Sequence, residues 1–189
     1  MNIHEKLLFL RGFIRDPLRV GSILPSSPLL AEKIIQIIPW HEVQTVAELG
    51  AGTGALTRFI ELNRAESSKL FLFERDRNMR ASLKLQFPAC NLHSNASSLL
   101  KNLDQEGISQ LDCIICGLPF FNFSNEMKER LLRQIVRSLK PGGYFVAYQF
   151  SLHMKKKYAA YFNIERIEFV SRSFPPAFVY VCRKQRPYQ

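Results

Sequence analysis

Residues 46–57, which read VAELGAGTGALT, place the tightest limits on how this chain folds. A short apolar run ends in an acidic residue, three glycines follow at alternate positions, and a stretch with helical periodicity comes next. This order predicts a strand that enters a tight loop and then a helix. Glycines allow a sharp turn and a closer ligand approach than a Cβ atom permits, and a helix start offers free N–H groups. The junction is therefore predicted to hold a cofactor that contains adenosine.

Two cofactor classes fit the glycine pattern, because Gly50, Gly52 and Ala55 also satisfy the dinucleotide fingerprint GxGxxG/A. The spacing of the three glycines, with an acid two residues before the first, resembles motif I of class I S-adenosylmethionine-dependent methyltransferases. In those enzymes the acid contacts the methionine end of the cofactor, where a sulfonium and an ammonium favour a carboxylate. The resemblance implies that S-adenosylmethionine is bound by Glu48, Gly50, Ala51, Gly52, Thr53 and Gly54.

Size and charge limit the classes of protein that the chain can belong to. With 189 residues, 47% of them hydrophobic, the chain suits one compact domain. A formal net charge of +10 favours anionic partners, namely RNA, DNA or an acidic membrane surface. No apolar run approaches the roughly 18 residues that span a bilayer. Charges at Arg11 and Arg15 interrupt the first apolar stretch, so we expect no secretion signal.

The four cysteines lack the regular spacing of a disulfide framework, which predicts a reduced, cytosolic setting. Cys113 and Cys116 form a CxxC pair, but they bracket two isoleucines in a predicted strand. We therefore expect them to pack in the core rather than to form a redox or zinc pair. The four histidines are scattered, and no metal-ligand cluster is predicted.

The N-terminal part of the chain is predicted to be helical. Residues 3–15 form an apolar stripe beside a basic one, typical either of a packing helix or of an amphipathic helix on anionic lipid. A loop rich in turn formers and hydroxyls follows at 20–28, and then a helix to Ile38. Ser27 is expected to cap this helix; alternatively, the loop folds over the cofactor and shapes the substrate entrance.

From Thr45 onward, strands and helices alternate. Strands are predicted near 45–49, 69–74, 91–94, 111–116, 143–149, 164–170 and 177–183, and helices near 56–62, 77–87, 126–139 and 153–161. The last two strands have no helix between them and are predicted to form an antiparallel hairpin, which argues against a dinucleotide dehydrogenase. We expect one domain over residues 1–189, with a helical extension over 1–40 and a Rossmann-like core over 41–189.

Two strand ends carry polar side chains suited to the adenosine part of the cofactor. Glu74 ends the second predicted strand, where a carboxylate accepts hydrogen bonds from both ribose hydroxyls. Arg75, beside it, is placed in the same site, where it either pairs with Glu74 or lies in solvent. Asn95 and Ala96 stand where this superfamily often has Asp-Ala, so the Asn95 oxygen is predicted to accept the adenine amino group. The alternative is an asparagine that serves only its own loop.

Gly117 and the three residues after it, Leu118, Pro119 and Phe120, resemble motif IV of amino-group methyltransferases. Adenine methylases have a polar residue at the first of these positions, which holds the flipped base, and its absence here argues against a base-modifying enzyme. Leu118, Pro119 and Phe120 are expected to contact the substrate, although Phe120 also suits a core position. Residues 140–143, KPGG, are predicted to form a turn before the fifth strand.

Four groups are predicted to orient the acceptor amine: the carbonyl of Gly117 and the side chains of Tyr148, Gln149 and Ser26. Much of the positive charge lies near the C-terminus. It forms either a solvated surface or a docking face for an anionic partner. The basic residues concerned are Lys155, Lys156, Lys157, Arg183, Lys184 and Arg186.

The chain as a whole resembles the small bacterial phospholipid N-methyltransferases nearly from end to end. The residues that carry this resemblance are 9–11, 20–27, 48–54, 117–120 and 175–180. It implies a Rossmann-like fold with a seven-stranded, mostly parallel sheet of order 3-2-1-4-5-7-6. It also implies methylation of the amine of phosphatidylethanolamine, up to three times in some members, by a cytoplasmic enzyme. Such an enzyme reaches the inner membrane face through an N-terminal amphipathic helix, so the expected partner is a phospholipid surface.

Two other functions stay open at this point. Ribosomal RNA adenine N6-dimethylases share the order of helix, GxGxG loop and Leu-Pro, as well as the basic charge. They usually add a C-terminal helical domain, whereas this chain ends soon after its last predicted strand. The third alternative is a non-catalytic adaptor that binds S-adenosylmethionine and a membrane or RNA.

Overall fold

A computed structural model describes residues 27–185 of the chain. The helix predicted over 3–15 and most of the predicted loop over 20–28, including Ser26, lie outside these residues. Among the described helices, none has the length and apolar character needed to cross a membrane.

The described residues form one seven-stranded sheet of order β3-β2-β1-β4-β5-β7-β6. The first five strands in this order run parallel, and β7 pairs antiparallel with both β5 and β6. The predicted sheet order and the closing hairpin are thereby confirmed. The strands are β1 (Thr45–Leu49), β2 (Lys69–Phe73), β3 (Asn91–His93), β4 (Leu111–Cys116), β5 (Leu139–Gln149), β6 (Asn163–Val170) and β7 (Ala177–Arg183).

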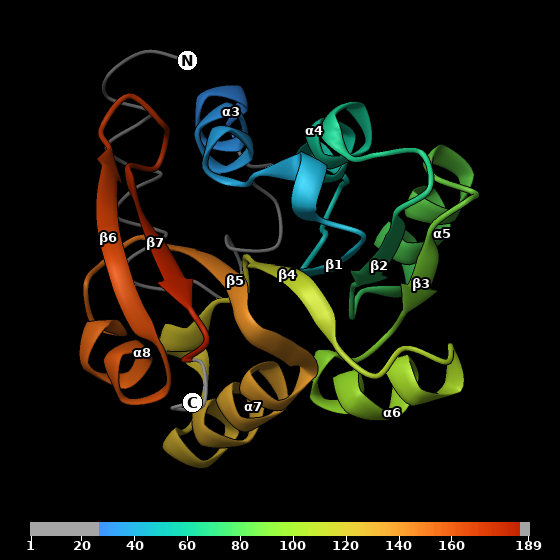
Figure 1. The fold of residues 1–189 in the computed structure, drawn as a ribbon. Coiled ribbons are helices and arrows are strands. Elements are labelled where there is room, and N and C mark those ends of the chain that lie inside the picture. The colour runs from blue at the N-terminus through green and yellow to red at the C-terminus, as the bar shows by residue number, and fades with distance from the viewer. Residues whose placement is uncertain (1–26, 186–189) are drawn as a thin grey trace.

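Helices cover both faces of the sheet (Figure 1). One face packs against α3 (Pro28–Ile37), α4 (Ala55–Asn63) and α5 (Arg77–Gln86), and the other against α6 (Leu99–Gln105), α7 (Asn125–Ser138) and α8 (Lys155–Tyr161). Short 3-10 helices lie at Trp40–Glu42, Ala96–Ser98 and Phe120–Asn122. Ser27 caps α3 as predicted, because its Oγ accepts a hydrogen bond from the Leu30 N–H at 3.3 Å.

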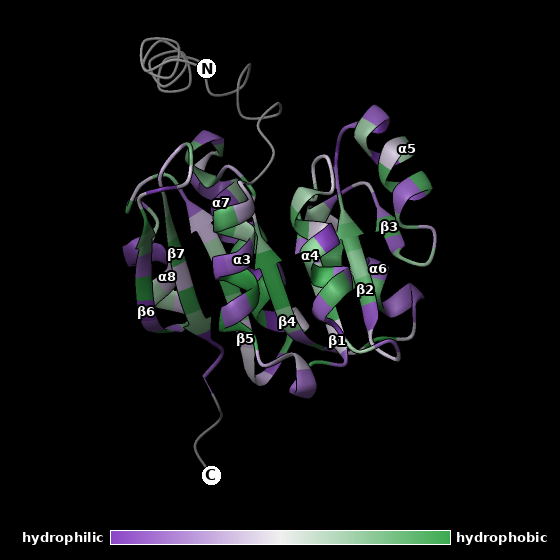
Figure 2. Ribbon diagram, turned by 90° about the horizontal axis from the view of Figure 1, so that it is seen from above, coloured by the Kyte–Doolittle hydropathy of each residue, from purple (hydrophilic) through white to green (hydrophobic). Residues whose placement is uncertain are grey.

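The central strands consist mostly of hydrophobic residues (Figure 2), and their side chains contribute to a core on each face of the sheet, as expected of a parallel sheet covered by helices. Successive side chains of a strand point to opposite faces, so two residues three positions apart face away from each other. Cys113 packs with the core on the α3 side and Cys116 with the core on the α7 side, and both are fully buried. The prediction that this CxxC pair packs in the core is confirmed.

Two local predictions were wrong. A helix, α6, lies between β3 and β4, where no helix was predicted. It has only seven residues and buries just Leu99 and Leu103, so its sequence gives a weak helical pattern. Strand β5 begins at Leu139, not at Gly143, and it includes the predicted KPGG turn. The pairing with β4 is irregular there. Leu139 pairs with Leu111 and Tyr144 pairs with Cys113, so five positions along β5 correspond to two along β4. The turn is therefore a bulge within a continuous strand.

Asp112 ties together the starts of three strands at the edge of the sheet opposite to the glycine loop. Its Oδ2 accepts hydrogen bonds from the backbone N–H groups of Gln44 and Thr45 at 3.0 and 2.9 Å and from Thr45 Oγ1 at 2.9 Å. Lys140 Nζ on β5 contacts Oδ1 at 2.6 Å. Partial burial alone would raise the pKa of Asp112, but these hydrogen bonds outweigh it, and the pKa lies below its usual value.

Replacing Asp112 with alanine is expected to destabilise the fold without changing the structure of the predicted cofactor loop. The Asp112→Ala variant leaves two backbone donors and one hydroxyl without their acceptor, so its free energy of unfolding should fall by about 1 to 3 kcal/mol. Urea denaturation followed by circular dichroism measures the change. The matched control is Asp104→Ala on the exposed side of α6, which should unfold like the wild type; equal stability of the two variants would contradict the role given to Asp112.

Candidate cofactor and acceptor site

The carboxyl ends of β1, β2, β4 and β5 meet at one edge of the sheet, where open α/β sheets bind their ligands. Backbone hydrogen bonds fix the loops there. The N–H groups of Gly50 and Ala51 both donate to the Phe73 carbonyl, at 2.8 and 3.1 Å, and the Gly117 N–H donates to the Leu49 carbonyl at 2.9 Å. The glycine loop, the end of β2 and the start of the Gly117 loop are therefore held as one unit.

The three glycines of the loop all have positive φ values, which L side chains rarely adopt, but their surroundings differ. A Cβ atom at Gly54 would lie 2.6 Å from the Phe87 ring, so this glycine allows close packing of α4 against the end of α5. A Cβ atom at Gly50 would lie 3.3 Å from Leu118. A Cβ atom at Gly52 would meet nothing within 4 Å. Gly52 is thus the position where the backbone is open to a ligand.

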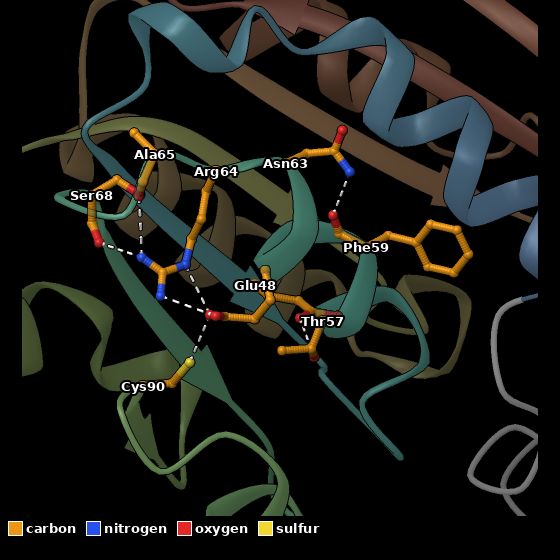
Figure 3. Close-up of polar contacts among 9 residues, drawn as sticks. Glu48, Thr57, Phe59, Asn63, Arg64, Ala65, Ser68 and Cys90 are labelled. Carbon is orange, nitrogen blue, oxygen red and sulfur yellow. Dashed lines mark hydrogen bonds and ion pairs between the residues drawn. The ribbon is translucent and has the colours of Figure 1, made fainter.

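Glu48, the last but one residue of β1, is a buried carboxyl group with 2% exposure. Thr57 Oγ1, in the first turns of α4, donates to Glu48 Oε2 at 2.6 Å; Figure 3 shows this pair beside a separate polar cluster around Arg64. Burial raises the pKa of Glu48 to about 8, the hydrogen bond from Thr57 lowers it, and the charge of Glu74 adds to the rise. A cation placed beside this group would favour its ionised form.

Glu74 lies one residue beyond the end of β2 and reaches back to the glycine loop. Its Oε2 accepts a hydrogen bond from the Gly52 N–H at 2.8 Å, and its Oε1 accepts one from the Asp76 N–H at 2.8 Å. These two bonds hold the carboxylate at the open side of the loop, next to Gly52. A carboxylate in that place suits a pair of ribose hydroxyls.

The remaining residues predicted for the cofactor lie on the rim of this edge. Asn95 is exposed, and its Oδ1 accepts a hydrogen bond from the Ser97 N–H at 2.9 Å, which starts the 3-10 helix that contains Ala96. The structure therefore shows Asn95 in the local capping role that was the alternative prediction. Thr53 and Arg75 are exposed.

The predicted acceptor loop follows β4 and contacts the glycine loop. The backbone carbon of Gly117 would lie 3.5 Å from a Cβ atom at Gly50. Leu118 is half-buried and Pro119 is exposed. Phe120 is fully buried and packs edge-on against Phe123 and Tyr158, at 5.8 and 5.9 Å between ring centroids. The structure thus agrees with the core alternative for Phe120.

The end of β5 brings two predicted residues to this loop. Gln149 is 3% exposed, and its Nε2 donates to the Leu118 carbonyl at 3.0 Å, so it anchors the loop. Tyr148 is half-buried, and its hydroxyl lies where a side chain at Gly117 would begin, 2.1 Å from a Cβ atom built there. Tyr148 and Gly117 are therefore together in the structure.

One contact of the site was not predicted. Thr57, which holds Glu48, was named only as part of the motif. Its position in α4, nine residues after Glu48, was the available signal, because a hydroxyl in the first turns of a helix that follows the loop points back at the strand end.

Comparison with known proteins decides which cofactor the site takes. The family described as "Methyltransferase domain" matches residues 47–145. The ornithine lipid N-methyltransferase of Singulisphaera acidiphila is 32% identical over 181 residues, which are 93% of this chain and 94% of that protein. This chain belongs to the methyltransferase domain family. It is a class I S-adenosylmethionine-dependent methyltransferase, and the dinucleotide alternative is excluded.

Solved structures agree with this fold. An O-methyltransferase from Bacillus cereus, in complex with SAH, has a TM-score of 0.69 at 10% identity and covers 93% of this chain and 90% of its own. An S-adenosylmethionine-dependent O-methyltransferase from Thermotoga maritima has a TM-score of 0.65 at 14% identity, covering 94% of this chain and 72% of its own. The residues present fit the cofactor: a buried carboxyl for its cationic end, an open glycine, and a second carboxylate for its ribose.

The affinity for S-adenosylmethionine is expected to rise with pH between pH 6 and 7.5. In the protein by itself Glu48 has a pKa of about 8, so below pH 8 the carboxyl mostly carries a proton. A cationic ligand favours the carboxylate and lowers this pKa, so binding at pH 7 should release close to one proton. Calorimetry in two buffers of different ionisation enthalpy measures the release, and identical heats in the two buffers would contradict this assignment of Glu48.

Replacing Glu48 with glutamine is expected to weaken S-adenosylmethionine binding by about 10- to 100-fold, as the loss of a hydrogen bond to a charged group implies. Glutamine keeps an oxygen for Thr57 but removes the charge, so the proton release should also disappear. The matched control is Glu61→Gln on α4, where Glu61 pairs with Arg64 at 2.8 Å outside the glycine loop. Wild-type affinity in both variants, measured by calorimetry, would remove Glu48 from the cofactor site.

Proposed function

We propose that this methyltransferase transfers methyl groups to the primary amine of a membrane lipid. The observation that carries the proposal is the near full-length identity of 32% to an ornithine lipid N-methyltransferase. Phosphatidylethanolamine is the acceptor that the resemblance in the sequence implies, and ornithine lipid is the acceptor named for that relative. Both present a primary amine on an amphiphile, so the site would handle the same group.

The proposed reaction needs a neutral amine in line with the methyl group that S-adenosylmethionine supplies. The amine lone pair forms the N–C bond as the C–S bond breaks, sulfur keeps that bonding pair, and the new ammonium loses one proton to solvent. A low-dielectric surrounding disfavours the ammonium form of the substrate, so a strong base is not required. The protein mainly has to hold the amine about 3 to 3.5 Å from the methyl carbon. In this proposal Gly117, Tyr148, Gln149 and Ser26 shape that position.

The partner proposed for the basic residues is an anionic or zwitterionic membrane surface at the cytoplasmic face. Lys155 and Lys156 are exposed at the start of α8. Other basic residues have partners within the fold: Lys157 pairs with Glu129 at 2.8 Å, and the Arg183 guanidinium lies over the Tyr144 ring. Attraction to a lipid surface would therefore depend on only part of the total positive charge.

RNA adenine methylation is the second candidate, favoured by the basic composition and the Leu118-Pro119 dipeptide. The contacts around Gly117 argue against RNA adenine methylation. The position that carries a polar side chain in adenine methylases is Gly117, and the space beside it is taken by Tyr148. A flipped base would then lack the polar side chain that orients its amino group.

The decisive experiment supplies labelled S-adenosylmethionine with three separate acceptors: liposomes containing phosphatidylethanolamine, liposomes containing ornithine lipid, and ribosomal RNA. We expect label in lipid, and the lipid that is labelled identifies the headgroup. Label in RNA alone would overturn the proposal. Binding of the cofactor without transfer to any acceptor would instead indicate the adaptor function, and Glu48→Gln provides the control for label that does not depend on the cofactor site.

A further inference from the structure

Gly117 is a glycine because of space and not because of its backbone conformation. Gly117 does not have a positive φ value, so its backbone conformation would accept any L residue. A Cβ atom there, however, would lie 2.1 Å from Tyr148 Oη, 2.6 Å from Cζ and 3.0 Å from Cε1. Only a residue without a side chain can follow β4 while Tyr148 holds this position.

The place that the phenol occupies is next to the cofactor loop. Strands β4 and β5 are neighbours, with Cys116 paired to Ala147, so the next residues, Gly117 just after β4 and Tyr148 within β5, lie side by side. Gly117 in turn lies against Gly50 of the cofactor loop. The Tyr148 hydroxyl is thus held at the point where the first side chain of the acceptor loop would otherwise project.

Contacts on either side hold the backbone that carries Tyr148. The neighbouring residue, Gln149, is buried and bonded to the Leu118 carbonyl, which locks β5 to the acceptor loop. The Tyr180 hydroxyl of β7 donates to the Ser151 carbonyl at 3.2 Å just after the strand ends. A side chain on backbone held in this way needs less ordering when a substrate arrives.

We infer that the Tyr148 hydroxyl takes over the task of the side chain that Gly117 lacks, accepting an N–H hydrogen bond from the acceptor amine. The inference rests on the proposed function for the identity of the amine. A phenol oxygen can accept this bond while its own proton is donated elsewhere. With one N–H held by Tyr148, the nitrogen lone pair is free to point at the methyl carbon. Tyr148 is a catalytic residue in this arrangement, and Gly117 and Gln149 position it.

Removing the hydroxyl alone tests the inference. In Tyr148→Phe the ring stays, and kcat for the lipid amine should fall by about 10- to 100-fold, as expected for one hydrogen bond to a group that becomes charged. Affinity for S-adenosylmethionine, measured by calorimetry, should equal that of the wild type. The matched control is Tyr144→Phe, on the same strand and the same face of the sheet but under the Arg183 guanidinium, and it should retain wild-type kcat. A kcat for Tyr148→Phe within twofold of wild type would overturn the inference.

A double-mutant cycle tests whether Gly117 acts through the same hydroxyl. Gly117→Ala should displace the phenol and lower kcat by a similar factor, and adding it to Tyr148→Phe should bring little further loss, because both changes remove one interaction. Losses that multiply would overturn the inference. If Gly117→Ala fails to fold, the comparison of the two tyrosine variants decides the question.

The proposed function is tested separately in the same experiment. Wild-type protein that labels only RNA refutes the lipid proposal, and the tyrosine variants assayed on that RNA still decide the role of Tyr148. Wild-type protein that binds cofactor but labels neither lipid nor RNA contradicts both.

Discussion

The predicted cofactor site is built around one buried carboxyl group near the end of a central strand. Glu48 lies in β1, between β2 and β4, where the sheet is covered on both faces and water is excluded. An acid in such a place is costly unless something compensates it, and within residues 27–185 its carboxyl group accepts a hydrogen bond from Thr57. A cationic ligand would offset the remaining cost of burying this charge, and the methionine end of S-adenosylmethionine carries positive charge. In the role predicted for Glu48, the carboxylate that is costly to bury in the protein by itself is the group that favours a cationic ligand.

The loop that follows Glu48 shows that a glycine motif combines several physical demands. Gly54 permits close helix packing against Phe87, whereas Gly52 faces open space and binds Glu74 through its N–H. All three glycines need positive φ, so none tolerates an ordinary side chain without strain. The motif is specific because the turn, the helix packing and the ligand approach must all be satisfied within five residues.

On the acceptor side, the same reasoning applies to one glycine and one tyrosine from different strands. Gly117 and Tyr148 are 31 positions apart, yet the parallel pairing of β4 and β5 places them together. In adenine methylases the polar group at this point belongs to the acceptor loop itself. Here the group at that point comes from the neighbouring strand, which changes the direction from which an amine would be held. Such an exchange is a simple way for one fold to accept a different amine.

The sequence by itself determined the parts whose signals are local: the strand–loop–helix at residues 46–57, the order of strands and helices, the Ser27 cap and the burial of Cys113 and Cys116. It did not reveal α6, because two buried leucines in seven residues give no clear period, and it placed the start of β5 four residues late, because Gly142 and Gly143 looked like a turn. The capping role of Asn95 was open, since an amide oxygen serves its own loop or a ligand equally well. Only the tertiary structure decided that the Tyr148 hydroxyl fills the space beside Gly117 and that Gln149 anchors Leu118, because those contacts depend on strand pairing between residues distant in the chain.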